Sequence, residues 1–397
     1  MLTSVHIKNF RSCKDVKLEG MGPMLGLVGR NGAGKTTILR AIEWAAATAL
    51  SRADFSEGDT SGSSSDPQAQ VRLMVDEFEY CYTWGTWAQA EHGQAERSRD
   101  EESLSVREPG TRWIPLLDRK DNAIALNGRE RRIMMNHGTA AVMPALASLL
   151  SESDPLQLHF QRVMAVFRGV RYYLGHGIFD PAFPLAREQR GPISRLVYER
   201  GTQAHVQTGP GHLSILLRLI HAHQTSPDIF AELKSRVGPE GLGLLSDIRV
   251  VTLGDVGGTG RGKTYYDVVF VPMGRDVELS LDQLSGGTRQ MLYLMLALLF
   301  DQSSTMLVEQ PEDGIHPALL AKLIDIFRVN TDPTQIILAS HSSTVLSSLQ
   351  PEDVRLVEMR GGSTQVRGLT GNEVQRAQDY IQREGSLAEF LELIQED

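Results

Sequence analysis

The sequence predicts a mixed α/β fold that combines an antiparallel β region with an inserted helical lobe. Three observations predict it. Short apolar runs of strand length alternate with amphipathic helical runs near both ends of the chain. A glycine-rich loop, residues 29–36, separates an apolar strand from a helix. Residues 246–253 and 264–271 have strand character on either side of a glycine-rich tip, which is typical of a β-hairpin.

The remaining elements follow in chain order. We expect strands over 2–8, 24–29, 71–84 and 169–175, and helices over 35–50, 139–168, 212–224 and 226–237. After the hairpin we expect a helix over 286–301, a strand over 305–309, a helix over 317–329, strands over 335–340 and 354–359, and one or two helices over 371–395. Residues 56–70 and 89–112 are polar or charged and are expected to form exposed loops, and 176–211 fits no element.

Composition narrows the class of protein. The chain has 397 residues, 41% hydrophobic and 22% charged, as in ordinary globular proteins. Its net charge of −9 means that a nucleic-acid surface would have to be a local patch. Cys13 and Cys81 form no CxxC pair, so neither a zinc site nor a disulfide framework is indicated. The chain starts like a strand rather than a signal peptide, and no run reaches about 18 apolar residues, so we expect a cytoplasmic protein without membrane contact.

The motif GRNGAGKT, residues 29–36, follows a strand and precedes a helix, the context in which it binds phosphate. Its glycines let backbone N–H groups turn inward around an anion, and the helix N-terminus adds its dipole. Lys35 can reach the β- and γ-phosphates, and the Thr36 hydroxyl can bind Mg²⁺. The sequence therefore predicts a site for ATP and Mg²⁺.

A second motif, LSGGTRQ, occupies residues 284–290, and MLVEQPEDGIHP follows at 306–317. Ser285 can cap a helix, and Gly286 and Gly287 permit close approach of an anion to the backbone. Serine–glycine turns are common, so this motif gains its meaning from the phosphate-binding loop upstream and from the acid that ends the next strand, Glu309.

In this order the motifs resemble those of ABC-type ATPases. LSGGTRQ looks like the ABC signature, and IKNFRSCKDVKLEG with LVGRNGAGKTTILRAI resembles the N-terminus of the RecF and SMC branch. The resemblance covers about residues 1–50 and 275–360 and extends to compact ATPases of bacterial defence systems and the overcoming-lysogenization-defect class. It implies an ABC-type P-loop ATPase head that pairs with a second head, with ATP held between the P-loop of one and the signature of the other.

Carried over onto this chain, the resemblance implies roles for individual residues. ATP would be bound by Arg11, Asn31, Gly32, Ala33, Gly34, Lys35, Thr36 and Thr37, and the partner head's ATP by Ser285, Gly286 and Gly287. Glu309 and Thr36 would hold Mg²⁺, His341 in LASHSS would sense the γ-phosphate, and EDGIHP would face the other head. A lone histidine is more often a packed or surface residue, and only the motif order favours His341. The Q-loop glutamine of the family has no assignable position; Gln161 and Gln189 are candidates in name only.

Gln310 stands where the family places a glutamate that acts as general base. An amide can hold the attacking water but cannot take its proton, so a contribution of about 10²–10⁴-fold to hydrolysis would be lost. We therefore expect tight ATP binding, slow turnover and a long-lived dimer. The residue is either natural, in an ATP-dependent clamp, or an introduced Glu→Gln substitution; the intact state of the other motifs favours the second origin.

The spacing of the motifs suggests four segments. Residues 1–90 would form the N-terminal half of the head, 91–245 an inserted, mainly helical lobe, 246–370 the C-terminal half and 371–397 a helical tail. The insertion is too long for a transporter ATPase and too short and aperiodic for a coiled-coil SMC arm. Residues 342–397 are too few for the nuclease domain that some relatives carry, so a partner would do any cutting.

These observations lead to one expected function and two alternatives. We expect an ATPase that forms a homodimer, with higher oligomers an open alternative, and gates an effector, a nuclease or toxin encoded nearby, in anti-phage defence. One alternative is a RecF-like repair ATPase that acts on DNA directly, and the other is a scaffold that sequesters a toxin or nuclease with little hydrolysis. Arginines at 129, 131, 132, 187, 190, 195 and 200, with the hairpin tip 254–263, could contact nucleic acid, but a solvated face is the more common explanation.

Overall fold

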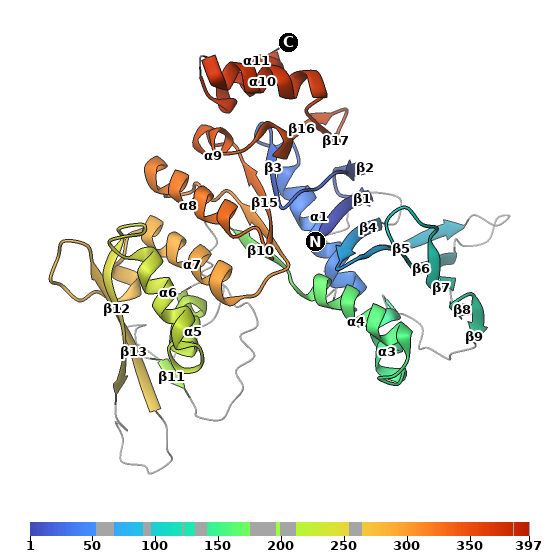
Figure 1. Ribbon diagram of the computed structural model, residues 1–397, viewed down its shortest axis with the longest axis horizontal. Helices are drawn as coiled ribbons and strands as arrows, with labels where there is room; N and C mark the ends of the chain where they lie inside the picture. Colours follow the sequence, from blue (N-terminus) through green and yellow to red (C-terminus); the bar gives the residue numbers. More distant parts are fainter. Residues whose placement is uncertain are drawn as a thin grey trace. The chain divides into compact units, whose positions relative to one another are not determined.

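The computed structural model describes residues 1–52, 67–89, 97–120, 123–131, 141–174, 196–198, 212–253, 264–383 and 385–396. The chain forms two compact units. The first comprises residues 1–172, 303–309 and 328–397, and the second comprises 173–302 and 310–327. Each is described by itself, and Figure 1 identifies the elements of both.

The first unit contains an eight-stranded sheet in the order β2-β1-β4-β5-β6-β7-β8-β9, whose neighbouring strands are all antiparallel. Its strands are β1 (Leu2–Phe10), β2 (Cys13–Leu18), β4 (Gln68–Val75), β5 (Phe78–Gln89), β6 (Arg97–Arg107), β7 (Ile114–Lys120), β8 (Ala123–Leu126) and β9 (Arg129–Arg131). In β6 the side chains of Glu102, Leu104 and Val106 alternate inward, which leaves the polar residues between them less buried.

A six-stranded sheet in the order β10-β14-β15-β3-β16-β17 lies in the same unit, except for the end of β10. The strands are β3 (Met24–Val28), β10 (Val170–Leu174), β14 (Thr305–Glu309), β15 (Gln335–Ser340), β16 (Val354–Arg360) and β17 (Ser363–Gly368). β14, β15, β3 and β16 are parallel neighbours, whereas β17 is antiparallel. Every residue of β3, β14 and β15 is buried, as expected for parallel strands covered on both faces.

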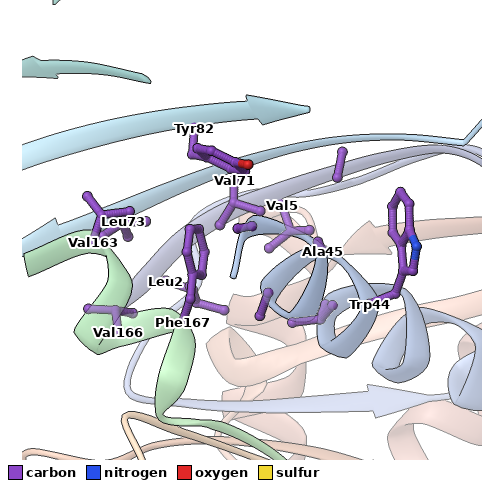
Figure 2. Close-up of a cluster of buried hydrophobic side chains, with 14 of the residues drawn as sticks. Leu2, Val5, Trp44, Ala45, Val71, Leu73, Tyr82, Val163, Val166 and Phe167 are labelled. Carbon is purple, nitrogen blue, oxygen red and sulfur yellow. The ribbon is translucent and has the colours of Figure 1, made fainter. Parts of the chain in front are cut away.

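The first unit also contains α1 (Lys35–Ala49), α3 (Met143–Leu149), α4 (Pro155–Arg168), α9 (Ser343–Ser347), the short helix η3 (Pro351–Asp353), α10 (Gly371–Arg383) and α11 (Leu387–Glu396). Side chains from both sheets and from α1, α3 and α4 form one hydrophobic core. In Figure 2, Trp44 and Ala45 of α1 and Phe167 of α4 lie beneath residues of β1, β4 and β5. This core fixes the start of α1, and with it the loop that follows β3.

Among its described residues, the second unit contains a three-stranded antiparallel sheet, β11-β13-β12, and several helices. Its elements are β11 (Leu196–Tyr198), α5 (His212–Thr225), α6 (Pro227–Val237), β12 (Leu245–Leu253), β13 (Thr264–Pro272), the short helix η2 (Leu281–Gln283), α7 (Gly286–Phe300) and most of α8 (Pro317–Val329). The buried guanidinium of Arg218 on α5 pairs with Asp301 at the end of α7, at 3.1 Å. α7 is therefore anchored at its C-terminal end.

Several expectations for single elements are wrong. Within 89–112, Gln89 is the last residue of β5 and Arg97–Arg107 form β6 rather than part of an exposed loop, and 71–84 span two strands joined by a turn. Residues 97–131 lie in the eight-stranded sheet of the first unit, so the part of the expected helical insertion before α3 is β structure. β2, β11 and β17 were not expected. The short helices η2, α9 and η3 were not expected either. The remaining strands and helices lie within a few residues of their predicted positions, except that 139–168 contains two helices instead of one.

Other expectations fall partly outside the described residues. The residues outside the described part of the chain include one candidate glutamine, several arginines and three segments: Gln189, Arg132, Arg187, Arg190, Arg195, Arg200, the hairpin tip 254–263 and most of 56–70 and 176–211. Gln161 is exposed on α4, and Arg129 and Arg131 belong to β9. Among the described helices, none combines the length and the apolar character needed to cross a membrane.

Candidate functional site

The predicted phosphate-binding loop joins the buried strand β3 to α1 in the first unit. Gly34 is the N-cap of α1 with φ of 104°, a backbone conformation that glycine adopts without strain. Among the described residues, no side chain caps this helix, so the backbone N–H groups of its first turn are left for another partner. Such an N-terminus attracts anions, because the exposed N–H groups and the helix dipole both favour negative charge.

Lys35 lies within the curve of this loop. Its Nζ donates hydrogen bonds to the carbonyl oxygens of Gly29, at 2.6 Å, and Arg30, at 3.1 Å. The side chain is largely buried, so it is directed at the loop rather than at solvent. Asn31, Gly32 and Thr36 are exposed, whereas Ala33 is buried and Thr37 is half-buried. The loop thus places a cation behind a set of exposed backbone groups, as phosphate binding requires.

Thr36 and Glu309 meet at the ends of neighbouring elements. The Thr36 hydroxyl donates a hydrogen bond to Oε1 of Glu309, although 273 residues separate the two in sequence. Glu309 is buried at the carboxyl end of β14. A hydroxyl and a carboxylate oxygen are the hard ligands that Mg²⁺ prefers, so this pair fits the magnesium ion of a P-loop site.

His341 follows β15 directly and lies beside the start of the same loop. It lines a cavity of about 240 Å³ together with Gly29 and Arg30. The other lining residues are Val28, Leu346, Ala388, Leu391 and Glu392. Three of these belong to α11, which the sequence did not assign to the site. The only signal in the sequence was the amphipathic pattern of the tail, and that pattern does not say where the helix packs.

Arg11 lies in the tight turn between β1 and β2. Its φ is 50° and that of Asn9 is 57°, so two residues other than glycine adopt the left-handed conformation here. The Arg11 guanidinium is 5.6 Å from the centre of the Phe10 ring. The next residue, Ser12, contacts Thr364, which in turn packs against Gly34. The Arg11 turn therefore adjoins the phosphate-binding loop.

The signature residues belong to the second unit. Ser285 is the N-cap of α7, and its Oγ accepts a hydrogen bond of 3.1 Å from the Thr288 N–H. Ser285 and Gly286 are exposed, whereas Gly287 packs so closely on Gly314 that an added Cβ would lie 2.3 Å from the Gly314 oxygen. The signature and the loop EDGIHP are thus held together within this unit.

Gln310 follows Glu309 in the chain but is grouped with the second unit. Its φ is 46°, and its carbonyl oxygen accepts a hydrogen bond of 3.2 Å from the Asp313 N–H. A left-handed conformation at a residue other than glycine is strained and is often found at functional positions. The predicted site residues are therefore divided: Arg11, the loop, Glu309 and His341 lie in the first unit, and Ser285, Gly286, Gly287 and Gln310 lie in the second.

Two parts of the chain match known families. Residues 4–121 match the family described as "AAA domain". Residues 167–347 match the family described as "AAA domain, putative AbiEii toxin, Type IV TA system". The first match contains the phosphate-binding loop, and the second contains the signature, Glu309 and His341.

Comparison with individual proteins gives a partial relative and a similar fold. The OLD nuclease of Thermus scotoductus is 56% identical over 43 residues, which are 11% of this chain and only 8% of that protein. An Smc head, in a crystal structure bound to the C-winged helix domain of ScpA, is similar over 94% of this chain and 99% of its own, with a TM-score of 0.51 and 15% identity. This second likeness concerns the fold alone.

The family matches and the short likeness to OLD nuclease support an ATPase of the ABC type, and the Smc head shows a similar fold. They confirm the predicted fold class and the resemblance that the motifs indicated.

Proposed function

We propose that this chain binds and hydrolyses ATP, forms a dimer around it and gates a partner effector in anti-phage defence. The observation that carries the proposal is the contact between Thr36 and Glu309 beside Lys35. Lys35 and Thr36 belong to one motif, and Glu309 lies 273 residues beyond Thr36, so residue types that P-loop ATPases need for phosphate and Mg²⁺ come together here from two distant parts of the sequence. No single local motif would produce this convergence.

Thr36 and Glu309 would hold Mg²⁺, which would neutralise phosphate charge when bound. Within the described residues, no group of three or more His, Cys, Asp or Glu side chains could hold a metal alone. The remaining ligands would be phosphate oxygens and water, as is usual for Mg²⁺. The carboxylate of Glu309 would orient the Thr36 hydroxyl, and Lys35 would stabilise the negative charge of the outer phosphates.

The exposed N-terminus of α7 supports the dimer. Ser285 and Gly286 are open to solvent, and their helix N-terminus favours an anion. Neither residue belongs to the unit that contains the phosphate-binding loop. We infer that Ser285 and Gly286 contact the γ-phosphate of an ATP molecule that is bound by a second copy of the chain. The defence role is supported by the partial likeness to OLD nuclease and by the toxin named in one matching family.

The experiment is ATP-driven self-association, measured by analytical ultracentrifugation with MgATP. The unmodified chain should form a dimer with ATP. Lys35→Ala should lose ATP binding in calorimetry, whereas Ser285→Arg should bind ATP and remain a monomer. Ser246→Arg, the same substitution at an exposed serine of β12, is the matched control and should dimerise.

Unchanged ATP affinity in Lys35→Ala would exclude the nucleotide site, and a dimer of Ser285→Arg would exclude the sandwich. Turnover that DNA stimulates without a partner protein would favour the RecF-like alternative. Stable co-purification with the product of a neighbouring gene, with hydrolysis absent, would favour the scaffold.

A further inference from the structure

The phosphate-binding loop rests directly on the hairpin formed by β16 and β17. A Cβ on Gly29 would lie 2.1 Å from the backbone oxygen of Val357 in β16. A Cβ on Gly34 would lie 2.1 Å from Oγ1 of Thr364 in β17 and 2.8 Å from its Cγ2. Both ends of the loop therefore touch the hairpin with no room for a side chain between them. The position of the hairpin determines where the loop can lie.

Thr364 also binds the turn that carries Arg11. Its hydroxyl forms a 2.7 Å hydrogen bond with the Ser12 hydroxyl, and its N–H donates to the Ser12 carbonyl oxygen at 2.8 Å. Thr364 is fully buried, so water cannot replace these partners. A single side chain thus contacts the Gly34 backbone on one side and Ser12 on the other, across 352 residues of sequence.

The turn needs such an anchor. Asn9 and Arg11 both have positive φ, and strained conformations of this kind persist only where the surrounding structure holds them. β17 lies beside β2, so the anchor joins the two sheets of the first unit at the phosphate-binding loop. Threonine suits the position because its hydroxyl and methyl groups both pack against Gly34, while the same hydroxyl reaches Ser12.

We propose that Thr364 is a positioning residue for nucleotide binding, which sets the Arg11 turn and the phosphate-binding loop in one fixed relation. This inference rests on the proposed function. In this positioning role Thr364 does not contact the nucleotide itself. It acts through Gly34 and Ser12, and the hydroxyl group, rather than the bulk of the side chain, is the active part.

The test is calorimetric titration with Mg²⁺ and the non-hydrolysable analogue AMP-PNP, so that slow turnover does not matter. Thr364→Val keeps the shape and removes the hydroxyl, and Ser12→Ala removes the same hydrogen bond from the other side. Each should weaken binding about fivefold, the effect of one hydrogen bond. The double variant should be no weaker than either single variant, because both remove one shared bond.

Two controls separate positioning from general stability. Thr364→Ser retains the hydroxyl and should bind AMP-PNP within about twofold of the parent. Thr48→Val removes another buried hydroxyl, on α1, that has no hydrogen-bond partner among the described residues, and should leave the affinity unchanged. A purely structural role for Thr364 would lower the melting temperature without changing the affinity of the folded protein.

Parent-like affinity in Thr364→Val and Ser12→Ala, together with loss of binding in Lys35→Ala, would overturn the inference and leave the proposed function standing. Binding that survives Lys35→Ala would instead contradict the proposed function itself. Equal weakening in Thr364→Val and Thr364→Ser would also overturn the inference, since the hydroxyl would then not be responsible.

Discussion

The proposed function places an amide at position 310, where hydrolysis would need a base, and the expected consequence can be measured. Gln310→Glu supplies a group that accepts a proton, so turnover should rise by about 100-fold or more. Glutamate and glutamine have similar backbone preferences, so the positive φ of this residue should not change the comparison. Phosphate release under single-turnover conditions measures the rate.

Gln310→Ala is the control for Gln310→Glu and should show no gain. Equal rates for Gln310→Glu and the unmodified chain would remove this residue from the catalytic account, whatever the origin of the amide.

Glu102 is a buried carboxyl group that is distant in sequence from the residues of the proposed nucleotide site. Its burial leads us to expect that the stability of the protein depends on pH. It accepts hydrogen bonds from the N–H groups of Val142, at 2.5 Å, and Met143, at 3.2 Å, and from the Tyr82 hydroxyl, at 3.1 Å. Burial raises the pKa of Glu102 from 4.5 to about 7. Because the folded pKa is the higher one, this group's contribution is complete below about pH 4.5 and is lost as the pH rises through about 7.

Between pH 6 and pH 8 this one group should lower the free energy of unfolding by about 1 kcal/mol. Urea titrations of the unmodified chain and of Glu102→Gln at the two pH values measure it. The difference between the two proteins should change with pH in this direction, and a difference independent of pH would contradict the assignment.

At the scale of elements, α11 is the helix that sequence reasoning left outside the site. Leu387, Phe390 and Leu391 are buried, and the helix packs on α9, which begins two residues after His341. In Figure 1 the helices α10 and α11, in red, lie next to α9 within the first unit. The side of the phosphate-binding loop near His341 is therefore lined by the tail of the chain.

Leu391→Ala should destabilise this docking by about 2–3 kcal/mol, the usual effect of a cavity at a buried leucine. Hydrogen exchange should then increase in α9 and α11. Leu393 lies on the same helix and is 53% exposed, so Leu393→Ala should leave exchange in α9 unchanged. Similar exchange in the two variants would mean that α11 does not support the element next to His341.

At the scale of the whole molecule, the predicted site is divided between two units, and a composite site should be recoverable by mixing. In a Gln310→Glu background, Lys35→Ala lacks a working phosphate-binding loop and Ser285→Arg lacks a working signature. Each alone should be inactive. A mixed dimer contains one intact loop facing one intact signature, so the mixture should hydrolyse ATP faster than the sum of its parts.

If the mixture stays inactive, the loop and the signature of the same chain must form the site, and the composite site between two chains is excluded. The control is to mix Lys35→Ala with the double variant Lys35→Ala/Ser285→Arg. That mixture contains no intact loop and should remain inactive at every ratio.

The motifs could be recognised in the sequence because each of them is local. Loop residues 29–36 carry their own glycines and cation, and apolar strands such as β14 and β15 show their burial in an uninterrupted run. β6 escaped prediction because its residues RSRDEESLSVR are mostly polar, and only pairing with β5 and β7 makes a strand of them. Propensity says little about a strand whose stability comes from its neighbours.

The sequence by itself determined the motifs on which the proposed chemistry rests: a loop suited to phosphate, an acid suited to Mg²⁺, a second motif suited to another phosphate and an amide where a base would be expected. The tertiary structure alone decided how these parts are supported. The contacts of Thr36 with Glu309 and of Ser12 with Thr364, and the place of α11 beside His341, join residues far apart in the chain. Local patterns cannot specify such contacts, because they depend on how whole sheets and helices pack.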